Sequence, residues 1–204
     1  MKQRFHLCRV GGLAVFGALL LHLSNLGAEE TKSRHMIDNS EVSSSAFEAM
    51  MPVLRHPRCM NCHSSGDFPR QGDDSHPHIM DVRRGTDGHG VNGVKCTTCH
   101  QDHNLPGVHM PPGAPDWGLP SSTTPMIWEG LNDRELCQLF KDPKRNGHRT
   151  VAQIVEHMHT PLVLWGWSPG EGRTPIPYSE KSFLENVKLW AENGAGCPVE
   201  NSNH

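Results

Sequence analysis

The chain has 204 residues and a formal net charge of −3 at pH 7, and it contains 15 histidines, 7 cysteines and 16 prolines. Beyond residue 28, only about 40% of the residues are apolar or glycine, below the ~45–50% that is usual in globular domains. These values exclude a collagen-like repeat, a coiled coil and a large self-sufficient core. The acidic balance also disfavours a nucleic-acid partner, because phosphates require clusters of Lys and Arg.

Residues 1–28 have the pattern of a secretory signal peptide. Lys2, Arg4 and Arg9 precede an apolar run of about 14 residues, and small residues lead up to Ala28. An uncleaved anchor is the alternative, but the run is shorter than the ~20 residues that span a bilayer. We therefore expect cleavage near Ala28, export to the periplasm or beyond, and no stable membrane insertion afterwards. Because the segment carries three basic residues and no acid, its loss changes the formal charge from −3 to −6.

Residues 29–45 are predicted to form a polar tether of low order. Ser, Thr, Asn, Asp and Glu occur throughout the stretch, which leaves few apolar side chains to pack. A short helix is expected from Ser45 to about Met51, with Phe47 on its inward face. Residues 46–204 are predicted to form a single domain.

Two strings in this domain have the form C-x-x-C-H: CMNCH at residues 59–63 and CTTCH at residues 96–100. This spacing is typical of c-type haem attachment. Two thiols three positions apart on one helical turn can each form a thioether to a porphyrin vinyl group, and the adjoining histidine then ligates the iron. The sequence therefore predicts two covalently attached haem c groups, held by Cys59, Cys62, His63, Cys96, Cys99 and His100.

A zinc site is the first alternative, because two C-x-x-C pairs can supply four thiolates. The 33 residues between the pairs exceed the usual spacing of about 15–20 for such sites, and zinc gives no reason for a histidine after each pair. Structural disulfides are the second alternative in an exported chain. A disulfide within C-x-x-C, however, is typical of redox enzymes near a βαβ pattern, which this sequence lacks.

Each motif is followed by loop-dominated sequence, at residues 64–95 and 101–127. Gly-Asp, Asp-Gly, Pro-Gly and Pro-Pro steps interrupt both stretches, and apolar periodicity is weak. Loops of this length are uncommon in compact domains unless they serve a function. We expect them to wrap the haems, so that residues 46–127 form a haem-attachment region.

Residues 128–198 are predicted to form a helical region. Three helices are expected, beginning at the capping residues Asn132, Thr150 and Ser179 and ending near Phe140, His159 and Asn193. The fold class that follows is mainly α with long loops and little or no β-sheet, a small multihaem cytochrome c-type fold wrapped around two haems.

Cys137 and Cys197 remain once the signal peptide and the motifs are set aside. An even remainder in an oxidising compartment predicts a disulfide, with two unpaired buried thiols as the alternative. Closing a loop of about 60 residues would stabilise the domain by roughly 4 kcal/mol in the chain-entropy model.

Over residues 52–198 the sequence resembles small exported dihaem c-type cytochromes, including a bacterial group labelled as the cytochrome subunit of isoquinoline 1-oxidoreductase. The resemblance implies electron transfer with a redox partner protein such as an exported or membrane-bound dehydrogenase. Besides the two haem motifs, it rests on the blocks HPR at 56–58, GDFP at 66–69, QGD at 71–73, PH at 77–78, RGTDG at 84–88, PGAP at 112–115, KDP at 141–143, LWGW at 164–167 and GAGCP at 194–198.

The sixth ligand of each iron determines what the haem can do. A His or Met there closes the iron and suits it to electron transfer, whereas an open position permits ligand binding. His78 and His157 are the best candidates, because enough chain separates them from the motifs to cross the ring. The methionine alternatives are Met110, followed by Met80 and Met158, and the assignment to particular irons stays open.

The sequence favours an electron carrier over an enzyme. No molybdenum-pterin or flavin motif is visible, so substrate oxidation would have to occur in a partner. The alternative function is a haem enzyme, a peroxidase or small reductase with one open iron, although no motif specifies its distal acid or base. A gas or redox sensor is a third reading, without an attached signalling domain in this chain.

Overall fold

The computed structural model describes residues 39–199. The predicted signal peptide and tether residues 29–38 lie outside the described residues. From Asn39 onward the chain forms one compact unit. Within the described part, no helix is long and apolar enough to cross a membrane.

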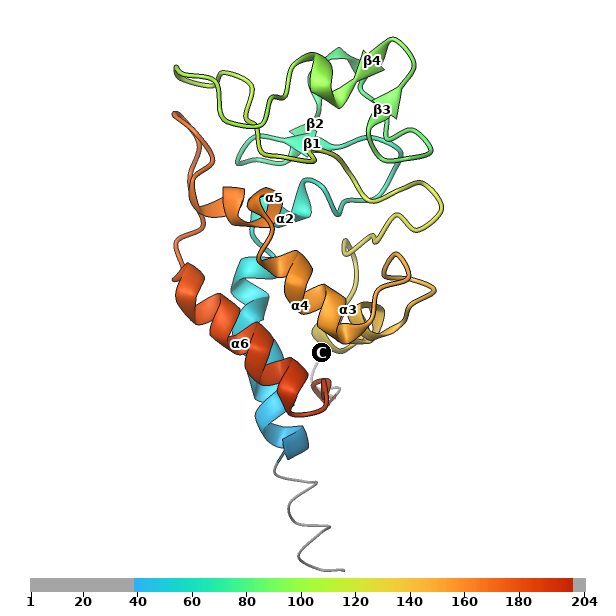
Figure 1. Ribbon diagram of the computed structural model, residues 1–204, viewed down its shortest axis with the longest axis vertical. Helices are drawn as coiled ribbons and strands as arrows, with labels where there is room; N and C mark the ends of the chain where they lie inside the picture. Colours follow the sequence, from blue (N-terminus) through green and yellow to red (C-terminus); the bar gives the residue numbers. More distant parts are fainter. Residues whose placement is uncertain (1–38, 200–204) are drawn as a thin grey trace, which may run out of the picture. The chain divides into compact units, whose positions relative to one another are not determined.

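Four helices build the lower half of this unit in Figure 1. The first covers residues 39–54. The others are α3 (Asp133–Lys141), α4 (Val151–Met158) and α6 (Glu180–Glu192), and α4 packs against both α3 and α6. Each of these three begins at its predicted capping residue, because the side chain of Asn132, Thr150 or Ser179 accepts a hydrogen bond from the backbone N–H three residues on. The three predicted C-terminal helices are therefore confirmed.

The first helix begins earlier than the sequence predicts. Residues 39–45, expected in the tether, are helical, and Ser43 is fully buried. Its hydroxyl donates to the carbonyl of Trp190 at 2.7 Å and accepts from the N–H of Gly196, also at 2.7 Å. The polar composition of this stretch concealed the helix, because its stabilising contacts are tertiary hydrogen bonds rather than an apolar stripe.

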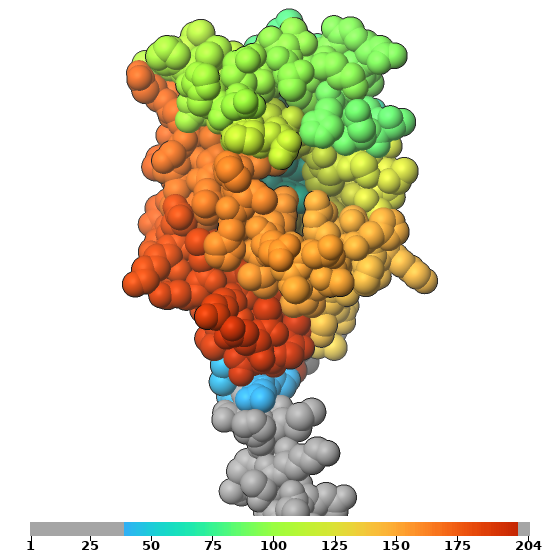
Figure 2. Space-filling view, in the orientation of Figure 1, coloured from blue at the N-terminus to red at the C-terminus, as the bar shows by residue number. Residues whose placement is uncertain are grey.

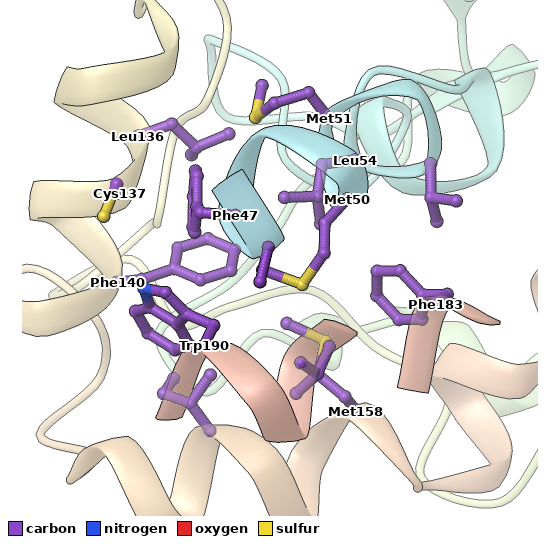
Figure 3. Packing of buried hydrophobic residues seen from close by; sticks show 14 of the residues in the cluster. Phe47, Met50, Met51, Leu54, Leu136, Cys137, Phe140, Met158, Phe183 and Trp190 are labelled. Carbon is purple, nitrogen blue, oxygen red and sulfur yellow. The ribbon is translucent and has the colours of Figure 1, made fainter. Parts of the chain in front are cut away.

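The four helices enclose an aromatic core, shown in Figure 3. Phe47 contacts Phe140 with ring centroids 5.8 Å apart and Trp190 at 5.6 Å. Cys137 and Cys197 form the expected disulfide, with Cα atoms 5.5 Å apart, which joins α3 to the segment after α6. The side chains of this core pack directly on one another, and some of them, including Leu54 and Phe140, also face the cavity described below.

The other half consists of loops with very short elements. The helices there are α2 (Pro57–Met60) and α5 (Pro161–Leu164), together with single 3-10 turns at Ile79–Asp81, Cys96–Thr98 and Trp165–Trp167. Two antiparallel pairs join β1 (Arg70–Gln71) to β2 (His76–Pro77) and β3 (Gly90–Val91) to β4 (Val94–Lys95). The expectation of a mainly α chain with long loops is confirmed, with these two small sheets as the β component.

Candidate haem sites

The first C-x-x-C-H motif opens onto a cavity of about 600 Å³ between the two halves of the unit. That volume lies within the range of ~300–1,000 Å³ that is usual for cofactor pockets. The space-filling view in Figure 2 shows this hollow, with teal atoms from the segment near α2 at its floor. All four helices contribute to its walls, and so do the loops that face them. The helical residues include Leu54, Phe140, His157 and Phe183, and the loop residues include Trp117 and Trp128.

The motif is held by α2 and the turn that follows it. Pro57 occupies the first turn of the helix, and His56 Nδ1 accepts a hydrogen bond from the N–H of Arg58 at 3.2 Å. His56 therefore serves as a helix cap. The N–H groups of Cys62 and His63 both donate to the carbonyl of Cys59 at 3.2 Å, which continues the turn through the motif. Both thiols and the imidazole thus line the cavity.

The ring of His63 is oriented by two contacts. Its Nδ1–H donates to the carbonyl of Met126 at 3.0 Å, and the ring stacks on Trp128 with centroids 3.7 Å apart and planes 4° apart. A backbone acceptor at Nδ1 selects the tautomer whose Nε2 carries a free lone pair, which is the arrangement of a metal-ligating histidine.

The second motif repeats this arrangement. The N–H groups of Cys99 and His100 donate to the carbonyl of Cys96 at 3.2 and 2.9 Å. The Nδ1–H of His100 donates to the carbonyl of Pro112 at 2.6 Å, and the ring stacks on Trp117 at 4.7 Å and 11°. Both motif histidines therefore present a free Nε2 and lie against an indole.

Gly113 makes the second arrangement possible. A Cβ on this residue would collide with the carbonyl oxygens of Gln101 and His103, so the chain after Pro112 can approach the motif only at glycine. This close approach places the Pro112 carbonyl under His100.

The structure brings each predicted distal histidine next to a different motif. His78 lies beside His100, with ring centroids 6.1 Å apart and planes at 65°, and its own Nδ1–H donates to the carbonyl of Ile79 at 2.6 Å. Two imidazoles that share one metal at about 2 Å each have ring centroids roughly 6 Å apart. His157, on α4, lines the same cavity as His63.

The methionine alternatives differ in their positions. Met158 is buried and lines the first cavity next to His157. Met80 and Met110 are 75% and 42% exposed on the surface near the second motif. Met158 is therefore the methionine alternative that the first cavity accommodates.

Burial sets the charge state of the groups around the first cavity. It raises the pKa of Cys59 to about 12 and that of Cys62 to about 11. It also lowers the pKa of His63 to about 3 and that of His157 to about 4. Both imidazoles are neutral at physiological pH, and the neutral form is the one that binds a metal.

The two sites differ in exposure. Cys99 and its surroundings lie at the surface. Among the described residues, six of the nine exposed large hydrophobic side chains lie between residues 79 and 110, the segment that carries the second motif and its neighbouring hairpin; they are Ile79, Met80, Val91, Val94, Val108 and Met110. The second site is therefore the one with an apolar, solvent-facing margin.

Among the described residues, the walls of the first cavity also contain a buried donor without a partner and an arginine without an ion pair. Trp128 is 4% exposed, and its Nε1–H has no hydrogen-bond partner within residues 39–199. A buried unpaired donor costs about 1–3 kcal/mol. Arg149 lines the same cavity and forms no ion pair with any described residue. A haem brings a large apolar ring and two carboxylates, so the residues present fit that group.

A shared zinc site would need a different arrangement. Across residues 39–199, no three His, Cys, Asp or Glu side chains converge closely enough to hold a metal ion between them.

Comparison of the chain with protein-family models, with curated proteins and with solved structures finds no match.

Sequence reasoning missed the residues that orient the motif histidines. Trp117, Trp128 and the carbonyls of Met126 and Pro112 lie in a loop stretch without apolar periodicity. A tryptophan in such a stretch, with no helix or strand to bury it, is the feature that could have indicated the wall of a cofactor site.

Proposed function

We propose that this chain is an exported dihaem cytochrome c that carries electrons between redox partner proteins, one of them a dehydrogenase. A bound haem c supplies an iron that exchanges one electron between its Fe(II) and Fe(III) states. The observation that carries the proposal is the repeated arrangement of the two motifs. In each, the histidine donates its Nδ1–H to a backbone carbonyl and directs a free Nε2 away from it.

The surroundings of the second motif support a closed iron at that site. The Nδ1–H of His78 also donates to a carbonyl, which leaves its Nε2 free, and its ring lies 6.1 Å from that of His100 between centroids. An iron between two imidazoles has both axial positions filled, which suits electron transfer rather than ligand activation.

The first cavity supports the same assignment for His63 and His157. Desolvation keeps both imidazoles neutral, and the apolar side chains of Leu54, Ile154 and Phe140 line the space between the helices. The apolar part of the pocket favours a bound haem over solvent, because it buries the ring.

The first test is to express the complete chain in a bacterium that attaches haem c in its periplasm. We expect the mass of the secreted protein to exceed that of the polypeptide after signal removal by two haems, and the oxidised spectrum to be low-spin. We also expect no rapid binding of carbon monoxide or cyanide. A chain with bound zinc and no covalent haem would overturn the proposal, and rapid carbon monoxide binding would favour the haem-enzyme alternative.

Matched variants assign each haem to its motif. Cys59→Ser with Cys62→Ser should leave one covalent haem per chain, and Cys96→Ser with Cys99→Ser should leave the other. A variant pair that retains two haems would show that the mutated motif is not an attachment site.

A further inference from the structure

Trp117 belongs to both haem sites. Its indole stacks on His100 at 4.7 Å and 11°, and the same residue lines the first cavity together with the side chains of the first motif. It is therefore in contact with the predicted ligand of one iron and with the space predicted for the other haem.

A second tryptophan also contacts the indole of Trp117. Trp165 meets it edge-on, with centroids 5.0 Å apart and planes at 90°. The Nε1–H of Trp165 donates to Asn104 Oδ1 at 2.9 Å, and the same oxygen accepts the N–H of Gly113 at 3.1 Å. Because Gly113 follows the carbonyl that orients His100, one hydrogen-bonded unit fixes both the histidine and the tryptophan that stacks on it.

The backbone around Trp117 is also constrained. A Cβ on Gly118 would come within 2.7 Å of the His89 ring, and the N–H of Leu119 donates to the carbonyl of Gly88 at 2.9 Å. The loop that carries Trp117 is thus anchored to the segment just before the second motif. These two contacts hold the loop independently of what occupies the cavity.

We propose that Trp117 is a positioning residue shared by both haem sites: it fixes the ring plane of His100 and brings that ligand against the haem of the first cavity. With both haems bound, the indole would lie between His100 and the haem of the first cavity, so electron exchange between a ferrous and a ferric haem would depend on it. No bond forms or breaks, no proton moves, and the indole is not oxidised. The inference rests on the proposed dihaem function.

The test compares three variants of the mature holoprotein. Trp117→Leu removes the aromatic stack, Trp117→Phe keeps an aromatic ring, and Trp167→Leu enlarges the same cavity. Trp167 is the control because it packs on Phe183 at 5.4 Å and stacks on neither motif histidine. Its effect is the baseline for any change caused by cavity volume alone.

Two readouts are needed. The electron paramagnetic resonance spectrum of the low-spin haems reports the orientation of the axial imidazoles. Laser-flash reduction with photoreduced flavin reports electron exchange between the haems. The rate at which electrons enter the protein depends on the flavin concentration, whereas the rate of exchange between the haems does not. We expect Trp117→Leu to shift the signal of one haem only and to slow the concentration-independent phase several-fold beyond the Trp167→Leu baseline. Trp117→Phe should restore most of the rate.

The outcomes separate this inference from the proposed function. If the parent protein lacks two low-spin haems, the proposed function itself fails. If the parent holds both haems and Trp117→Leu matches the Trp167→Leu control in both readouts, Trp117 is ordinary cavity packing and the inference is wrong. A changed signal with an unchanged exchange rate would also overturn the shared role, because Trp117 would then act on His100 alone.

Discussion

The imidazole of His78 lies 6.1 Å from that of His100, measured between ring centroids, and the two planes meet at 65°. The two residues belong to different loops. His78 directly follows β2, and the β3–β4 pair lies between it and His100 in the chain. This spacing fits two imidazoles that bind one metal from opposite sides. His78 is therefore proposed as a ligand at the second motif rather than at the first.

Replacing His78 by Ala should open the second iron. We expect His78→Ala to convert one of the two haems from low-spin to high-spin and to allow that haem to bind carbon monoxide, because one axial position becomes vacant. Absorption and paramagnetic resonance spectra measure the change. The matched control is His76→Ala, whose imidazole pairs with Asp74 on the surface of the same hairpin. An unaltered spectrum in His78→Ala would eliminate His78 as a ligand.

His157 should have the same role at the first iron. His157→Ala is expected to make the other haem high-spin, and His157→Met should keep it low-spin while raising its reduction potential, since a thioether ligand favours the reduced iron. His159→Ala is the control, because this histidine lies at the end of the same helix and donates to the carbonyl of Val155. If Met158→Ala, rather than His157→Ala, opens the iron, the methionine is the ligand.

The disulfide should stabilise the helical half without affecting the haems. Cys137→Ser with Cys197→Ser is expected to lower the free energy of unfolding by about 2–4 kcal/mol, because the bond closes a long loop in the unfolded chain. Urea denaturation followed by circular dichroism measures this loss. The low-spin haem spectrum should be unchanged at low urea, and a loss of either haem from the folded double variant would contradict a purely structural role.

Preventing haem attachment should affect the two halves of the unit differently. In a chain with all four motif cysteines replaced by Ser, we expect the helices around Phe47, Phe140 and Trp190 to form, because their core consists of protein side chains. Residues 64–127 should become sensitive to proteases, because their loops have few regular hydrogen bonds. Limited proteolysis with mass spectrometry locates the cleavage sites. Equal resistance of both halves would show that the loops fold without haem.

Features that depend on neighbouring residues were predictable from the sequence. The motif at residues 96–100 places two thiols and an imidazole on one turn through local geometry alone. The capping boxes at Asn132 and Thr150 act over three residues, and both helices begin where those patterns indicate. The pairing of Cys137 with Cys197 followed from elimination, since no other described cysteine lies outside a motif.

Only the tertiary structure decided which residues surround each motif histidine. The carbonyls of Met126 and Pro112, the indoles of Trp117 and Trp128, and the separate positions of His78 and His157 all depend on contacts between segments far apart in the chain. The buried hydroxyl of Ser43 shows the same limit, because a polar residue in a polar stretch gives no local sign of tertiary hydrogen bonds. The sequence by itself determined the turn of each C-x-x-C-H motif and the capped helices, since both act within one helical turn. The surroundings of each motif histidine depend on packing between distant segments, which no local pattern encodes.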